Sequence, residues 1–152
     1  MPQIRPYAWM LLAAIALTGM TVACTVPPES PEAETDSETV SQEGRSAYSE
    51  VPLPAEGQRF GADPEQIALE AYGIAEPGEG NFSQEVMTVD QSSTQAVVVL
   101  TQTGLLDDSV EGMRYWLEFE AGEAQWELVW VGRQVRCYPG RGAQDWTTDL
   151  CS

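Results

Sequence analysis

Apolar and polar residues alternate most regularly over residues 113–131. Between 113 and 121, every second position holds Met, Tyr, Leu, Phe or Ala, whereas the positions between them hold Arg, Trp and two Glu residues. Trp126, Leu128 and Trp130 continue this period of two beyond a turn at residues 122–124. Such a period is typical of a strand with one buried face. Two strands of this kind joined by a short turn predict a β-hairpin.

Two more apolar runs precede the hairpin. They are rich in Val, Thr and other strand-forming residues and are separated by polar residues. Residues 97–100 are apolar on both faces, which suits a central strand. The second strand of the hairpin continues as far as Cys137. The pattern therefore predicts four strands, at residues 85–90, 95–102, 113–121 and 125–137.

A short helix is predicted before these strands. Asp63 suits the N-cap, Pro64 suits the first helical position, and Gln66 is placed to complete a capping box. Gly73 ends the helix, with Ile74 available for the apolar contact of a Schellman-type cap. The residues that lie on one face at helical spacing are Ile67, Ala68, Ala71 and Tyr72.

One helix followed by four antiparallel strands predicts an α+β fold, in which the short helix packs on a four-stranded antiparallel meander. This order of elements resembles the cystatin-like and NTF2-like arrangements, although the chain has no cystatin inhibitory motif. Function does not follow from such a likeness, because one fold serves many activities.

Residues 1–23 have the composition of a signal peptide, with one basic residue, Arg5, then an apolar run over residues 7–17 and small residues before Cys24. The apolar stretch of residues 7–23 is also at the short limit for spanning a bilayer. A retained signal anchor is therefore the alternative to a cleaved leader.

The residues that end this leader, Thr21, Val22, Ala23 and Cys24, resemble the lipobox of bacterial lipoproteins. The resemblance implies that the Cys24 sulfur is diacylated and that Cys24 becomes the mature N-terminus. It implies a location in the bacterial cell envelope, anchored in a membrane and facing the periplasm or the exterior. The alternative is an ordinary secreted protein in which Cys24 is only the first cysteine after the cleavage site.

The chain has three cysteines, Cys24, Cys137 and Cys151. An exported protein with three thiols leaves one over unless it is used elsewhere. A lipid would use Cys24, and Cys137 would then pair with Cys151 in a disulfide that closes a C-terminal loop, as is usual in an oxidising compartment. Metal or redox chemistry at these two thiols is the alternative, which lacks support because the chain has no His and no CxxC spacing.

Residues 24–58 are rich in Pro, Glu, Ser and Thr and have few apolar side chains to offset the entropy of folding. We expect a disordered acidic tether here, between the lipid and a compact domain of residues 59–152. The alternative is that the acids attract a basic partner. The acidic residues that precede Arg45 are Glu29, Glu32, Glu34, Asp36, Glu38 and Glu43.

The composition argues against several functions. The net charge is −17, all seven basic residues are Arg, and there is no His. This charge disfavours nucleic acid as a partner, and without imidazole the chain has neither a Ser-His-Asp triad nor a His-ligated zinc site. Asp107, Asp108 and Glu111 suggest a weak cation site or an acid/base pair, but a polar loop between two strands explains them more simply. Glu118 and Glu120 have the spacing of a glycosidase pair, but alternation along a strand already predicts solvent-facing acids there.

Residues 132–152 hold three of the seven arginines. With two aromatic residues they form a candidate surface for an acidic or anionic partner, because Arg and aromatic side chains are frequent interface anchors. The alternative pairs Arg141 with Asp145 or Asp149 while Trp146 covers the end of the sheet. The candidate residues are Arg133, Arg136, Tyr138, Arg141 and Trp146.

The C-terminal sequence also carries a longer pattern. Trp-Glu-Leu-Val-Trp-x-Gly-Arg-Gln is followed by Arg-Cys, by Pro-Gly-Arg-Gly-x-Gln-Asp-Trp and by a last Cys. This pattern is similar to that of small uncharacterised lipoproteins of cyanobacterial type, and the similarity implies no activity. We therefore expect a lipid-anchored, extracytoplasmic binding or assembly factor that is not an enzyme and holds no metal or cofactor. The alternative is a small-ligand-binding or hydrolytic domain with a pocket between helix and sheet.

Overall fold

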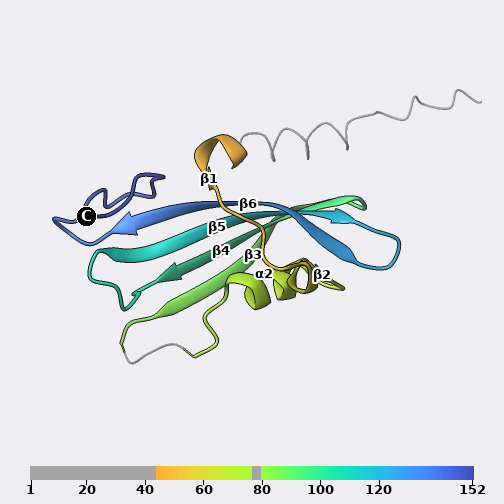
Figure 1. Cartoon of the computed structure of the whole chain (residues 1–152), viewed down its shortest axis with the longest axis horizontal. Coiled ribbons are helices and arrows are strands. Elements are labelled where there is room, and N and C mark those ends of the chain that lie inside the picture. Colours follow the sequence, from red (N-terminus) through yellow and green to blue (C-terminus); the bar gives the residue numbers. More distant parts are fainter. Residues whose placement is uncertain (1–43, 77–79) are drawn as a thin grey trace, which may run out of the picture.

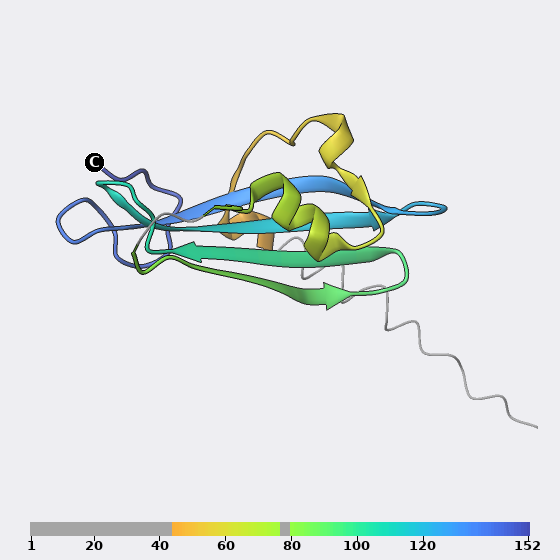
Figure 2. The same cartoon turned by 90° about the horizontal axis from the view of Figure 1, so that it is seen from below.

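The computed structural model describes residues 44–76 and 80–152. The predicted signal peptide, the lipobox and the predicted tether up to residue 43 lie outside these residues. The described chain forms one antiparallel sheet with the helix α2 on one of its faces and a helical turn at residues 44–47 against the other (Figures 1 and 2). Its elements are β1 (Ser49–Glu50), the 3-10 helix η1 (Glu56–Gln58), β2 (Phe60–Gly61), α2 (Pro64–Tyr72), β3 (Ser83–Gln91), β4 (Gln95–Thr103), β5 (Val110–Ala121) and β6 (Trp126–Cys137).

The four long strands, β3 to β6, form a meander in which each strand pairs with the next along the chain. The predicted α+β class is confirmed, but the prediction of four strands is wrong, because the sheet has six. The additional strands, β1 and β2, have two residues each and both pair with the outer edge of β6. Two residues are too few to show an alternating pattern, so the sequence pattern did not predict them.

The sheet also includes part of the segment expected to be tether. In β1, Ser49 pairs with Arg133 and Glu50 pairs with Gly132. The Val51 N–H donates to the Val131 carbonyl at 3.0 Å. Contacts with the sheet therefore begin before residue 58, because the unpaired edge of β6 offers backbone hydrogen bonds that do not depend on side-chain type.

The core lies between α2 and the sheet (Figure 2). Leu117 and Phe119 of β5 point toward the helix and are almost fully buried, whereas their even-numbered neighbours point to the other face. Tyr72 of α2 stacks on Tyr115, with ring centroids 4.7 Å apart. The buried residues of this cluster are Ile67, Ala68, Ala96, Val98, Leu100, Leu117, Phe119, Leu128 and Val131.

The start of α2 follows the prediction in part. Asp63 is the N-cap, and its side chain accepts a hydrogen bond from the Glu65 N–H at 2.9 Å, with Pro64 in the first turn. The predicted capping box is wrong, because the Gln66 side chain instead donates to the Glu70 carboxylate at 2.8 Å. Residues four apart lie on the same helix face, so the Glu70 carboxylate is within reach of the Gln66 amide.

The end of α2 differs from the predicted Schellman-type cap. Gly73 has extended backbone angles (φ −71°, ψ 151°), not the left-handed ones such a cap needs. The next N–H, that of Ile74, donates to the Gln84 side chain on β3 at 2.9 Å. A partner on the sheet therefore decides how the chain leaves the helix.

The predicted disulfide is confirmed. Cys137, the last residue of β6, is bonded to Cys151, with Cα atoms 5.6 Å apart. Within residues 44–76 and 80–152, no helix has both the length and the apolar character needed to cross a bilayer.

Candidate binding surface

The sheet face opposite α2, here called the open face, carries the even-numbered side chains of β5. Arg114, Trp116 and Glu118 lie there, since Tyr115 and Leu117 between them face the helix. Directly paired residues share a face, so β6 contributes the residues opposite them. Those residues are Gln134, Gly132 and Trp130. The open face is therefore aromatic and charged, whereas the helix face is apolar.

Three side chains from distant parts of the chain meet at one end of the open face. The Arg114 guanidinium carbon lies 4.3 Å from the centroid of the Trp146 ring, and that of Arg136 lies 5.1 Å from it. We call these three residues the Arg-Trp cluster. Gly112 leaves room for the ring, because a side chain there would meet it at 3.1 Å. Two cations over one indole suggest a binding site for negative charge.

The two arginines of the cluster differ in their partners. Arg136 forms a salt bridge with Glu111. The hydrogen bond between them raises the pKa of Arg136 and lowers the pKa of the Glu111 carboxyl from its ordinary 4.5. Arg114 forms no salt bridge within the part of the chain that the structure describes. Its Nε donates to the Thr101 hydroxyl at 3.3 Å, and its side chain also hydrogen-bonds the Tyr48 hydroxyl. Both partners are uncharged, so no acid among the described residues neutralises Arg114 by a salt bridge.

The disulfide holds the loop that carries Trp146. Cys137 N–H donates to the Ala143 carbonyl at 2.8 Å, and Val135 and Thr147 exchange two backbone hydrogen bonds of 2.8 and 2.9 Å. The loop therefore continues the sheet beyond the edge of β6. This pairing holds the backbone next to Trp146 in place.

The five predicted surface residues do not form one patch. Arg136 and Trp146 lie in the Arg-Trp cluster. Arg133 pairs across the sheet with Tyr115 and so lies on the α2 face. The Tyr138 hydroxyl donates to the Leu105 carbonyl at 3.2 Å.

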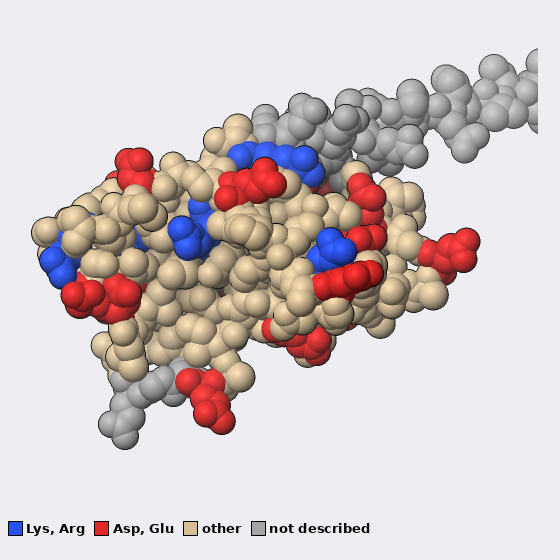
Figure 3. All heavy atoms as spheres, viewed as in Figure 1, with Lys and Arg blue, Asp and Glu red and all other residues tan. Residues whose placement is uncertain are grey.

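Arg141 has a partner that the sequence did not indicate. Its Nη2 lies 3.1 Å from the Asp108 carboxylate, and its Nε donates to the Asp108 carbonyl at 3.1 Å. The expected alternative partners, Asp145 and Asp149, are not those it uses. The C-terminal loop is thus attached to the β4–β5 loop, and Trp146 lies on the open face. On the face drawn in Figure 3, basic side chains form separate patches and not one basic area.

The acidic groups weighed as catalytic sites have other contacts. Asp107 accepts hydrogen bonds from the Val110 N–H and from both the N–H and the hydroxyl of Ser109, and these bonds lower its pKa. This geometry is a turn that leads into β5. Glu118 was expected to face solvent, but it is buried. Within the described residues, no group of three His, Cys, Asp or Glu side chains is arranged to hold a metal ion.

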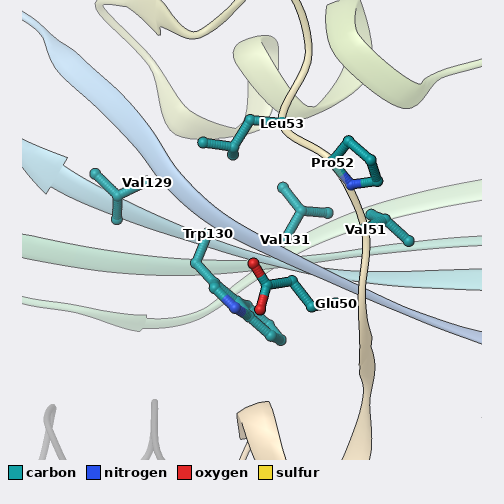
Figure 4. A pocket seen from close by; sticks show the side chains of 7 residues that line it. All are labelled: Glu50, Val51, Pro52, Leu53, Val129, Trp130 and Val131. Carbon is teal, nitrogen blue, oxygen red and sulfur yellow. The ribbon is translucent and has the colours of Figure 1, made fainter.

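A shallow groove lies where the chain after β1 crosses β6 (Figure 4). Its volume is about 440 Å³, and Figure 4 shows Leu53 on one side of it and Val129 and Trp130 on the strand. A second hollow of about 270 Å³ lies at the β5–β6 turn. No residue of α2 lines either hollow. Between α2 and the sheet the space holds the close-packed core, with Ala68, Leu117 and Leu128 fully buried.

Arg114 is the residue of the cluster that the sequence analysis did not select. Its place on the polar side of an alternating strand was visible, but nothing in the local sequence placed it beside Trp146, 32 positions later.

We find no match to this chain among protein-family models, among curated proteins or among solved structures. Its function therefore has to be inferred from the surface itself.

Proposed function

We propose that the protein is a non-catalytic binding factor of the bacterial cell envelope, attached to a membrane by a lipid on Cys24, which recognises an acidic partner through the Arg-Trp cluster. The observation that carries the binding surface is Arg114, a cation held over an indole without a salt bridge among the described residues. In a chain of net charge −17, the positive charge of such a site selects acidic groups locally.

The loop closed by the Cys137–Cys151 disulfide supports this proposal. Arg and Trp are enriched among residues that dominate interface energetics, and here both arginines and the indole are positioned by β5, β6 and the disulfide-closed loop. A rigid site loses less entropy on binding than a flexible one. The alternative of a pocket between helix and sheet has less support, because core side chains fill that space.

Arg114→Ala and Trp146→Ala are expected to weaken binding of the partner at least about tenfold, since loss of an interface anchor costs more than about 1.4 kcal/mol. The measurement is quantitative recovery of envelope proteins by the immobilised variants. Arg133→Ala is the matched control, because it removes an arginine from the opposite face of β6. Proteins that wild type and Arg133→Ala retain, and that the two cluster variants lose, support the proposal. Equal recovery by all four proteins contradicts it.

The lipid on Cys24 is tested separately by intact mass of the mature protein from membranes. We expect a chain that starts at Cys24, carries the added mass of acyl groups and gains two hydrogens on reduction of the disulfide. Cys24→Ala is expected to lose both the acyl mass and the attachment to the membrane fraction. An unmodified Cys24 in the wild-type protein would contradict the lipid anchor. It would not affect the Arg-Trp cluster, which the Arg114→Ala and Trp146→Ala variants test separately.

A further inference from the structure

The open face carries a buried carboxylate that the Arg-Trp cluster does not use. The side chain of Glu118 is only 6% exposed, although it lies on the face opposite α2, because the helical turn at residues 44–47 covers it. Both of its oxygens have partners: Oε1 accepts from the Trp116 indole N–H at 3.1 Å, and Oε2 accepts from Arg45 Nε at 2.9 Å and Nη2 at 2.6 Å. Burying a carboxylate is costly unless its partners are well placed, so these hydrogen bonds are what allow Glu118 to be buried.

The ligand of this carboxylate is a guanidinium group that also lies against an aromatic ring. The Arg45 guanidinium carbon is 5.2 Å from the centroid of Trp130, which pairs with Glu118 across β5 and β6. A flat cation with several N–H donors satisfies both contacts at once, whereas an ammonium lacks the planar face. The chemistry of the site is therefore that of an arginine receptor. It consists of Glu118, Trp116 and Trp130, called here the guanidinium acceptor.

The acceptor and its present ligand are held very differently. The acceptor residues stand on β5 and β6, the most extensively paired strands of the sheet. Arg45 belongs to residues 44–50, which contact the sheet through the two-residue β1 and through a hydrogen bond from the Gln134 side chain to the Ala47 carbonyl at 2.9 Å. In the same segment the Tyr48 ring lies 5.6 Å from that of Trp116, and Gly44 lies against Trp116. The Arg45 side chain is 48% exposed. None of residues 44–50 belongs to the core cluster on the opposite side, so displacement of Arg45 breaks contacts of the open face only.

We infer that the guanidinium acceptor binds an arginine side chain presented by a peptide segment of a partner, and that Arg45 occupies it in cis until such a segment displaces it. Arg45 itself shows the chemistry that the acceptor selects. The inference goes beyond the proposed function and does not depend on it, because the Arg-Trp cluster binds acids with cations, whereas this site binds a cation with an acid.

Occupancy in cis has a measurable consequence. When a site is free in only a fraction of the molecules, the apparent affinity for a ligand is the intrinsic affinity multiplied by that fraction. Arg45→Ala in the full chain is therefore expected to bind N-acetyl-arginine amide at least about tenfold more tightly than the wild-type protein does. Titration calorimetry and Trp fluorescence report the binding. The probe is also expected to raise the Tm of the variant, because it binds the folded state.

The controls separate a guanidinium site from unspecific binding. N-acetyl-citrulline amide has nearly the shape of the probe but no charge, and we expect it not to bind. Arg45→Ala with Glu118→Gln is expected to lose binding of arginine, and Arg141→Ala is expected to behave as wild type. A peptide that copies residues 44–50 presents the same arginine, and we expect it to bind Arg45→Ala at least about tenfold more tightly than it binds the wild-type protein.

Three results would overturn the inference: equal arginine binding by wild type and Arg45→Ala, equal binding of the arginine and citrulline probes, or arginine binding that persists without the Glu118 carboxylate. Arg45→Gln removes the charge but keeps a longer polar side chain, and it replaces the alanine variant if that variant does not fold. Binding of the 44–50 peptide would also support a second copy of this chain as one source of the arginine.

Discussion

Replacing both Cys137 and Cys151 with Ser is expected to lower the free energy of unfolding by about 2–4 kcal/mol. The two cysteines are 14 residues apart, and closing a loop of that length restricts the unfolded chain by about 3 kcal/mol in the chain-entropy model. The same change frees the loop that positions Trp146, so the Arg-Trp cluster should bind its partner less tightly as well.

Urea unfolding followed by Trp fluorescence measures the first effect in the unacylated chain. Cys24→Ser is the control, since it removes the one cysteine that is not in the disulfide. We expect its unfolding free energy to stay within about 0.5 kcal/mol of wild type, the usual range for substitutions away from structural contacts. A double variant as stable as this control would show that the disulfide contributes nothing to the fold.

Leu117→Ala is expected to cost about 2–5 kcal/mol, the range for deletion of a buried leucine side chain. Leu117 is 0% exposed and lies at the centre of β5, paired with Val98 of β4 and Val131 of β6 beneath α2. Truncation leaves a cavity that neighbours on three strands and the helix cannot fill without moving.

Leu106→Ala is the matched control for this prediction. It deletes the same atoms, but Leu106 is 77% exposed in the β4–β5 loop. Its unfolding free energy should differ from wild type by no more than about 0.5 kcal/mol. Equal losses for the two leucine variants would contradict the placement of the core between α2 and β5.

The pattern of side chains predicted the long elements well. The strand expected at 95–102 is observed at Gln95–Thr103, and the one expected at 125–137 is observed at Trp126–Cys137. The alternation that predicted them arises because one face of each strand packs against α2, and every second residue, which lies on that face, is therefore apolar. Asp63 and Pro64 likewise indicated the start of α2, because a helix N-terminus needs these residue types locally.

Contacts between distant segments were harder to predict. Glu118 was expected to face water because its neighbours alternate, yet residues near 45 cover it. Arg141 was expected to pair within its own loop, yet it pairs with Asp108 in another. In both cases several partners of suitable charge were available along the chain, and only the folded geometry selects among them.

Local patterns and residue counts were enough to predict the α+β class, the approximate strands, the helix start and the Cys137–Cys151 pair. Periodicity, capping preference and the small number of cysteines can all be read without knowing the fold. Three features became visible only in the folded chain: β1 and β2 join the edge of β6, Arg114 contacts Trp146, and Arg45 binds Glu118. Those contacts join residues 32 and 73 positions apart in the two side-chain cases. Their energy depends on which surfaces the packed sheet brings together, and no local pattern records that.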